Sequence, residues 1–410
     1  MNNVQTIDKL IMVRATKTTS KSAAKNKKNG CTLTVKPKVL LSNLTLLNAA
    51  VTSNQQGLDR LCIEVGNSQS IFSVGGDIGV RITHKANKTF NSAPIQVSCR
   101  QLKNYAGTLD SSNHKLHLAP EQVTIANQKE TYQHSLITYK DTITEHNADF
   151  TAVAKVKASE FKQALDRVAP FADSDIKNIV SGICLQLKPI VAESSEDSSE
   201  LELTLTGISV PGMGHITLQV DSIETDEMGA IDNLALVLPK KAATFIANNA
   251  EDFTLSISEK SVRFSWGNVE CTVQTLKGKF PDLKKIKASV SGNDTSVEFN
   301  RSELQAALKR HQVASSEIEF KIDGEECTLI QSTEAGSGAE NIYCSNDDAK
   351  EPIGLSLPID YLVKVVASVK SEVIALQLDL VPEEGEDIAC NNILVEDDDA
   401  LYCLTQLVAE

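Results

Sequence analysis

The sequence predicts an α+β protein made of three similar domains, because one succession of elements occurs three times. A strand followed by a helix is expected at residues 31–53, 152–169 and 296–314, and a second such pair at 95–109, 234–249 and 353–370. The first helix of each copy begins near residue 37, 158 or 301. That spacing is far longer than a solenoid repeat of roughly 20–50 residues and matches the size of a domain.

The chain therefore divides into a tail at residues 1–30 and domains at 31–147, 148–288 and 289–410. The tail has no acidic residue between residues 14 and 30 and is predicted to be a disordered basic segment, with a transit peptide as the alternative. Nine cysteines without a CxxC pair favour reduced thiols in the cytoplasm over disulfides or a zinc site. No apolar run is long enough to span a bilayer, so no membrane is expected as a partner.

The net charge of −14 argues against a nucleic-acid partner, but the placement of the charge argues for one. The six expected helices contain 15 Lys and Arg but 4 Asp and Glu, over residues 36–52, 98–109, 155–169, 239–250, 301–314 and 357–371. Basic helices on an acidic body suit a protein that contacts phosphate on one face. The alternative is that lysines merely solvate the outer sides of these helices.

Each helix is expected to bury one face, and each strand is expected to alternate apolar and polar residues. In the helix at 155–169, Phe161, Leu165 and Val168 form one stripe, and Lys162 and Arg167 lie off it. Strands with alternating apolar residues are typical of half-buried antiparallel sheets. Residues 253–257 and 262–266 are expected to pair through a hairpin connection at 258–261.

No catalytic constellation is visible, since the seven histidines show no HExxH spacing and no Walker loop occurs. The Gly-Met-Gly-His stretch at 212–215 follows a proline and is expected to form a turn. The three acids at 397–399 are expected in a solvated loop, and His114 and His117 at the surface. The pattern predicts no enzyme, no cofactor and no metal, and favours a scaffold or binding function.

Residues 278–286 read GKFPDLKKI, directly after an expected strand. This segment resembles the link between the second and third domains of the bacterial sliding clamp, the beta subunit of DNA polymerase III. Leu283 stands where that family usually has an aromatic residue. The similarity continues in VSGICLQL at 180–187, LALVLPKKAATFI at 234–246 and LPIDYLVKVVASV at 357–369, and it covers roughly residues 31–410.

The resemblance implies the DNA clamp fold, with three repeated clamp-type domains in a head-to-tail ring dimer. Helices would line a central hole around duplex DNA, and antiparallel sheets would form the outer wall. Sequence-independent phosphate contacts permit sliding. The residues expected to face the DNA are Lys38, Arg100, Lys103, Lys162, Arg167, Lys240, Lys241, Lys309, Arg310 and Lys364.

The resemblance also implies a subunit interface and a pocket for partner peptides. The edge strand at 131–136 would meet an edge strand of the third domain in the other subunit, with Tyr132 and Val313 as apolar interface residues. The pocket would lie between the second and third domains. The residues that match pocket positions are Val180, Thr206, Pro281, Lys285, Ile286, Tyr361, Asn392, Cys403, Leu404 and Leu407.

The pocket departs from the family's pattern in two places. Residues 206–211 keep the Thr alone of the usual Thr-Asp-Gly-His-Arg-Leu, and the chain ends in TQLVAE in place of Met-Pro-Met-Arg-Leu or similar. The implied partners are a replicative polymerase, within a holoenzyme that has 3′–5′ exonuclease activity, and a clamp loader. The divergence leaves the preferred peptide motif open.

Two functions compete at this stage. One is a non-enzymatic processivity clamp on duplex DNA, a cytoplasmic homodimer. The other is a nucleic-acid-binding or scaffold protein that keeps the three-domain architecture but grips another partner, such as a single strand. Single-strand binders stack bases on aromatic side chains. Aromatic residues make up 4% of this chain, so the clamp is preferred.

Overall fold

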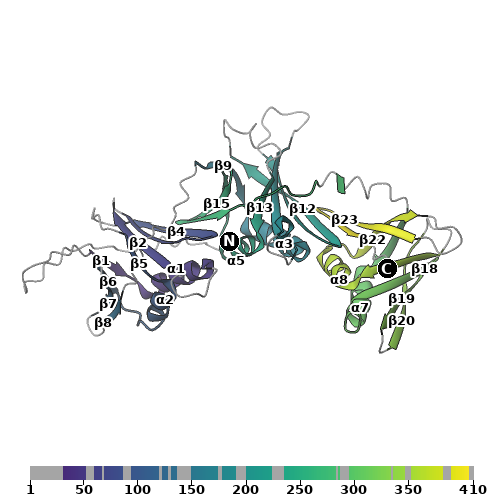
Figure 1. Cartoon of the computed structure of the whole chain (residues 1–410), viewed down its shortest axis with the longest axis horizontal. Coiled ribbons are helices and arrows are strands. Elements are labelled where there is room, and N and C mark those ends of the chain that lie inside the picture. Colours follow the sequence, from purple (N-terminus) through teal and green to yellow (C-terminus); the bar gives the residue numbers. More distant parts are fainter. Residues whose placement is uncertain are drawn as a thin grey trace, which may run out of the picture. The chain divides into compact units, whose positions relative to one another are not determined.

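The computed structural model describes residues 31–51, 60–66, 69–85, 94–119, 122–127, 131–135, 149–173, 178–190, 200–223, 235–282, 285–286, 295–333, 336–346, 352–381 and 389–405 (Figure 1). The tail predicted at 1–30 lies outside these residues. The chain forms two compact units, one of Met1–Lys155 with Asn248–Gln274 and one of Val156–Ala247 with Thr275–Glu410. The division into three domains stays a prediction, and the three copies are called repeats below.

The predicted succession of elements is confirmed. The first strand–helix pairs are β1 (Cys31–Val35) with α1 (Pro37–Ala50), β9 (Thr151–Val156) with α3 (Ala158–Val168), and β17 (Thr295–Asn300) with α7 (Arg301–Gln312). The second pairs are β5 (Ile95–Ser98) with α2 (Cys99–Gly107), β13 (Ala235–Pro239) with α5 (Lys240–Asn249), and β21 (Ile353–Pro358) with α8 (Ile359–Ser368). These helices begin close to where the sequence places them.

Three helices carry local signals in their first turns. Pro37 occupies the first turn of α1, where its missing N–H costs nothing. The Ser98 hydroxyl accepts a hydrogen bond from the Gln101 N–H at 3.2 Å and caps α2. The Asn300 side chain caps α7 in the same way. Such caps contribute about 1 kcal/mol each.

Antiparallel strands of the first unit form two sets. One has the order β1, β6 (His114–Ala119), β7 (Gln122–Ala126), β8 (Thr131–Ser135). The other runs β14 (Phe253–Ile257), β15 (Ser261–Trp266), β16 (Val269–Gln274), β4 (Ile78–Lys85), β3 (Gln69–Val74), β2 (Arg60–Gly66), β5. Helix α1 packs against α2 and against β3 and β4. The predicted hairpin at 253–266 is confirmed as β14 and β15.

One surface residue was predicted wrongly in this unit. His114 is fully buried, because its ring nitrogens find partners inside. Nδ1 lies 2.9 Å from the Ser112 carbonyl oxygen, and Nε2 lies 3.0 Å from the Asn127 side-chain nitrogen. The sequence places these partners in a loop and therefore does not reveal them.

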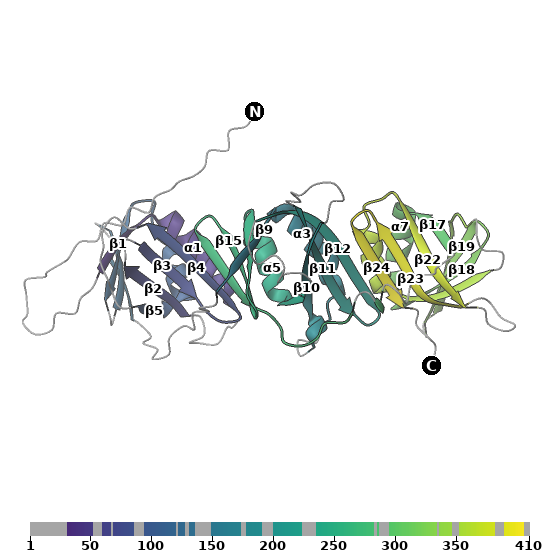
Figure 2. The same cartoon turned by 90° about the horizontal axis from the view of Figure 1, so that it is seen from above.

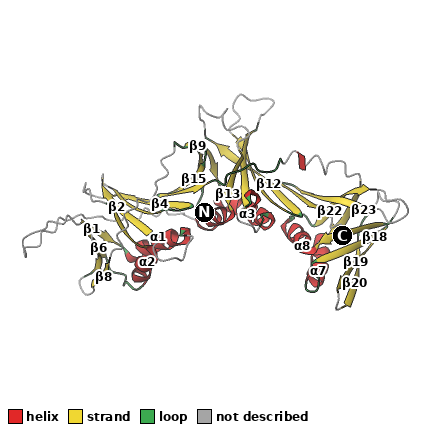
Figure 3. Cartoon of the chain, in the orientation of Figure 1, coloured by secondary structure: helices red, strands yellow, loops and turns green. Residues whose placement is uncertain are grey.

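Antiparallel strands of the second unit also form two sets. The larger has the order β13, β10 (Gly182–Pro189), β11 (Glu200–Ser209), β12 (Gly212–Ser222), β24 (Ala400–Thr405), β23 (Ala389–Asp397), β22 (Val373–Val381), β17 (Figure 2). The smaller runs β20 (Gly336–Tyr343), β19 (Glu326–Thr333), β18 (Glu317–Asp323), β21. Helices α7 and α8 pack side by side against these strands (Figure 3).

Neighbouring repeats are joined in the same way in both units. Strand β4 of the first repeat pairs with β16 of the second, with Ile82 opposite Val269. Strand β12 of the second repeat pairs with β24 of the third, with Met213 opposite Cys403. Within the described residues, β8 and β20 remain as edge strands of their sheets. The positions of β4, β12 and β20 correspond in the three repeats, as do those of β16, β24 and β8.

None of the helices within the described ranges is long and apolar enough to cross a membrane.

Candidate functional site at the junction of the second and third repeats

The outer face of the junction carries an apolar row across four strands. In register, Ile208 of β11 lies opposite Met213 of β12, Met213 opposite Cys403 of β24, and Cys403 opposite Leu394 of β23. Ile286, from the link between the repeats, packs against this row. Met213, Leu394 and Cys403 are buried, whereas Ile208 and Ile286 are partly exposed. Burial raises the pKa of the Cys403 thiol to about 11, so the thiol stays neutral at physiological pH. We call Ile208, Met213, Leu394, Cys403 and Ile286 the apolar row.

A second row on the same face combines apolar and polar residues. Thr206 lies opposite His215, His215 opposite Leu401, and Leu401 opposite Glu396. The Thr206 hydroxyl and His215 Nδ1 are 2.8 Å apart. A pocket of about 660 Å³ opens beside Leu401 and Glu396 of this row, next to the turn between β23 and β24. Its lining residues are His215, Thr217, Ser371, Leu394, Glu396, Asp397, Asp398, Asp399, Ala400 and Leu401.

The inner face of the same strands requires glycine. A Cβ at Gly214 would lie 2.6 Å from Phe171 Cδ2, and one at Gly212 would lie 3.1 Å from both Tyr361 and Leu404. The Tyr361 hydroxyl also accepts a hydrogen bond from Ser209 Oγ at 3.0 Å. The turn predicted at 212–215 is therefore wrong: these residues begin β12, and the glycines permit close approach of aromatic rings.

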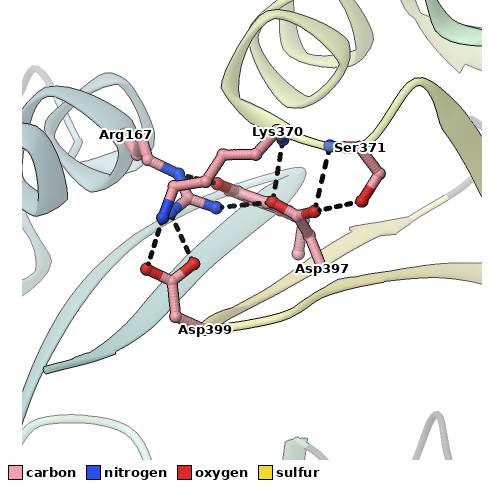
Figure 4. A network of polar contacts seen from close by, with 6 residues as sticks. Arg167, Lys370, Ser371, Asp397 and Asp399 are labelled. Atoms are coloured by element: carbon pink, nitrogen blue, oxygen red, sulfur yellow. Dashed lines mark hydrogen bonds and ion pairs between the residues drawn. The ribbon is translucent and has the colours of Figure 1, made fainter. Parts of the chain in front are cut away.

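A buried network of charged groups links α3 to the turn between β23 and β24 (Figure 4). Arg167 donates to Asp397 at 2.9 Å, to Asp399 at 2.7 Å and to the Tyr402 hydroxyl at 3.0 Å. Asp397 also accepts from the backbone N–H of Lys370 and from the Ser371 hydroxyl. Lys370 Nζ lies 2.9 Å from Asp399. We call these groups the Arg167 network.

This network corrects two predictions. Arg167 was expected to face DNA, but it is 8% exposed and its guanidinium pairs with two carboxylates. The acids at 397–399 were expected in a solvated loop, but Asp397 is 6% exposed. The reason lies in the tertiary structure, because partners more than two hundred residues apart meet here and no local pattern records that meeting.

The network shifts the titration of its members. Burial disfavours the charged carboxylate of Asp399, but hydrogen bonds from Lys370 and Arg167 outweigh burial and hold its pKa below the ordinary value. The contribution of Asp399 to stability is therefore present at neutral pH. That contribution is lost as the pH falls through the depressed pKa of the folded state.

The predicted pocket residues do not all share one face. Thr206, Cys403 and Ile286 belong to the two outer rows or pack on them, and Lys285 beside Ile286 is exposed. Val180 packs with a neighbouring cluster of Cys184, Val237 and Phe280, and Pro281 follows that phenylalanine. Tyr361 and Leu404 lie on the inner face, with Leu404 buried. Asn392 is half-buried in β23, and Leu407 lies outside the described residues.

The predicted DNA-facing residues, Arg167 excepted, have side chains that reach solvent. Lys38, Arg100, Lys241 and Lys309 are exposed, and Lys103, Lys162 and Lys240 are half-buried. Lys364 Nζ lies 4.3 Å from the centre of the Tyr361 ring. Burial and the charge of Lys364 hold the pKa of Lys240 below its ordinary value, so α5 and α8 bring like charges close together. Arg310 pairs with Glu340 of β20.

Of the two predicted interface residues, Val313 follows α7 and is 89% exposed. Tyr132 belongs to β8, and its side chain lies outside the description. Within the described residues, no group of three or more His, Cys, Asp or Glu is placed to hold a metal ion.

No protein-family model and no curated protein sequence matches the chain. Solved structures do match over nearly its whole length. A DNA polymerase sliding clamp from Pseudomonas aeruginosa superposes with a TM-score of 0.77 at 15% identity, covering 92% of this chain and 100% of that one. A sliding clamp from Bartonella birtlesii bound to griselimycin has a TM-score of 0.75 at 18% identity, covering 93% and 100%.

A Helicobacter pylori beta clamp bound to a DNA ligase peptide is similar too, with a TM-score of 0.73 at 14% identity over 92% of this chain and 100% of that one. The chain therefore has the fold of the DNA polymerase III beta subunit, the α+β DNA clamp fold. At this level of identity the likeness establishes the fold alone.

The Arg167 network should hold the junction together. Arg167→Met keeps a long side chain but leaves Asp397 buried without its cation. Breaking a buried ion pair costs about 3 kcal/mol or more. We expect hydrogen exchange of the β12 and β24 amides to become about 100-fold faster. Lys162→Met on the same helix, at a side chain that is 45% exposed, should change nothing. Equal exchange rates in the two variants would contradict this role.

Proposed function

We propose that the chain is a DNA sliding clamp, a homodimeric ring that encircles duplex DNA and tethers a replicative polymerase. The observation that carries the proposal is the clamp fold combined with basic helices on a chain of net charge −14. The chain acts without chemistry of its own, in the cytoplasm, as a divergent relative of the bacterial beta subunits. A clamp loader that opens the ring is a further partner.

Ring closure is supported by the repeated junction. Each junction pairs an edge strand of one repeat with the corresponding edge of the next, β4 with β16 and β12 with β24. The remaining members of the two sets are β20 and β8, which are edges within the described residues. Pairing β20 of one subunit with β8 of another would repeat the same contact and close a two-fold ring. It would also cover two exposed sheet edges.

The assembly can be tested at Val313, which we place beside the β20–β8 contact. Val313→Asp would bury an unpaired carboxylate in the interface, at a cost that favours dissociation. Sedimentation velocity at micromolar concentration should show a dimer for the parent chain and a monomer for this variant. Val373→Asp, at another exposed valine, is the matched control and should remain a dimer. A monomeric parent chain would rule out the ring.

Contact with DNA is supported by the crowding of cations on the helices. Burial, together with the nearby charge of Lys364 of α8, lowers the pKa of Lys240 of α5, and a polyanion beside these two lysines would offset their like charges. Clamps need only weak contacts, because the closed ring holds the duplex. We therefore assign the DNA surface to the basic residues named above without Arg167, and expect each to contribute little.

The DNA surface is tested by neutralising four exposed or half-exposed lysines together. Changing Lys38, Lys162, Lys241 and Lys309 to Gln should weaken association with a short duplex about ten-fold and reduce its salt dependence, since fewer counterions are released. Changing Lys115, Lys188, Lys260 and Lys321 to Gln removes the same charge from strands and turns. If both sets had the same effect, DNA would be sensing net charge and not these helices.

The partner groove is assigned to the outer face of the junction. The partly exposed Ile208 and Ile286 of the apolar row, above its buried members, would contact the Leu and Phe anchors of a short extended peptide from a polymerase or clamp loader. Val180 and Pro281 bound the neighbouring end of the link, and Lys285 stands at the rim. The inner-face positions of Tyr361 and Leu404 make them supports of the groove.

A further inference from the structure

The pocket at the turn between β23 and β24 holds two kinds of carboxylate. Asp397 and Asp399 are matched by Arg167 and Lys370 within the Arg167 network. Glu396 and Asp398 are exposed, and neither makes an ion pair with any residue that the structure describes. The pocket therefore presents two uncompensated negative charges to whatever enters it.

The pocket is continuous with the apolar row. Leu394 and Leu401 line the pocket and also belong to the hydrophobic cluster formed with Met213 and Cys403. Glu396 stands directly opposite Leu401 on the same face of the sheet. A chain segment that lies over the buried row from Ile208 toward Leu394 would thus bring its next residues to the two free carboxylates.

No Lys or Arg of the neighbouring strands offsets these carboxylates. Strands β11 and β12 contain no Lys or Arg, and the His215 ring in the pocket lining lies 2.8 Å from the Thr206 hydroxyl. Lys370 is committed to Asp399 at 2.9 Å, and the Cys403 thiol is neutral. In the free chain water solvates the exposed Glu396 and Asp398, and a cation that reaches them must come from another segment.

We propose that this pocket binds a Lys or Arg side chain of the partner segment, immediately beside the apolar anchors that lie on the row. The inference rests on the proposed function and adds a specificity rule to it: partners of this clamp carry a basic residue at one end of the anchor motif. A pocket that combines an apolar floor with carboxylates at its rim suits the long alkyl stem and cationic head of Lys or Arg.

Synthetic peptides test the rule on the full chain. Three fluorescein-labelled peptides share the same Leu and Phe anchors and carry Lys-Lys at the amino end, Lys-Lys at the carboxyl end, or Gln-Gln at both. By fluorescence polarisation, one Lys peptide should bind about five-fold more tightly than the Gln peptide, equivalent to about 1 kcal/mol. The preference should shrink as salt is raised from about 0.05 to 0.5 M.

Variants then locate the preference. The double change Glu396→Gln and Asp398→Asn should abolish it while leaving the Gln peptide's affinity unchanged. The matched pair Glu317→Gln and Asp323→Asn removes two exposed carboxylates from β18 and should leave the preference intact.

Each contrary outcome has a separate meaning. Equal affinities of the three peptides would overturn the inference about the basic residue without contradicting the proposed groove. If none of the peptides bound, the result would contradict both the proposed groove and the inference. A Lys-Lys peptide without anchors that bound as tightly as the anchored one would show that charge alone is recognised, and would overturn the coupling of pocket and row.

Discussion

The pairing of β12 with β24 is the contact on which the structure of the second unit depends. It makes one sheet out of strands from two repeats, and the Arg167 network fixes α3 to the turn that leads into β24. Breaking a buried ion pair leaves an uncompensated charge, so the network resists separation of the repeats more strongly than surface ion pairs would. Both outer rows cross the β12–β24 pair, so their alignment depends on the register of that pairing.

Both faces of that sheet follow from the same contact. Alternation along β12 sends Met213 and His215 outward and leaves Gly212 and Gly214 inward, where Phe171 and Tyr361 need the space. Any slip in the pairing of β12 with β24 would exchange the two faces. The proposed groove, the acidic pocket and the packing of Tyr361 beneath them therefore all depend on the same strand register.

The sequence predicts the elements of the fold well and its tertiary partners poorly. Helices α1, α2 and α7 begin where their first turns signal them, and the stripe of Phe161, Leu165 and Val168 is buried as expected. Arg167 lies one position before Val168 and was placed in solvent because its partners come from the other end of the chain. Likewise, the glycines of β12 suggest a turn until the aromatic rings that require them are known.

Topological capture of DNA tests the account most directly, and it needs no clamp loader. A ring can thread onto the ends of linear duplex, and ligating that duplex into a circle in the presence of the protein should trap it. After removal of free protein at a salt concentration that abolishes electrostatic binding, we predict that the chain remains with the circle and is released when a single cut linearises it. Protein that leaves the intact circle, or stays after the cut, would contradict the sliding-clamp function.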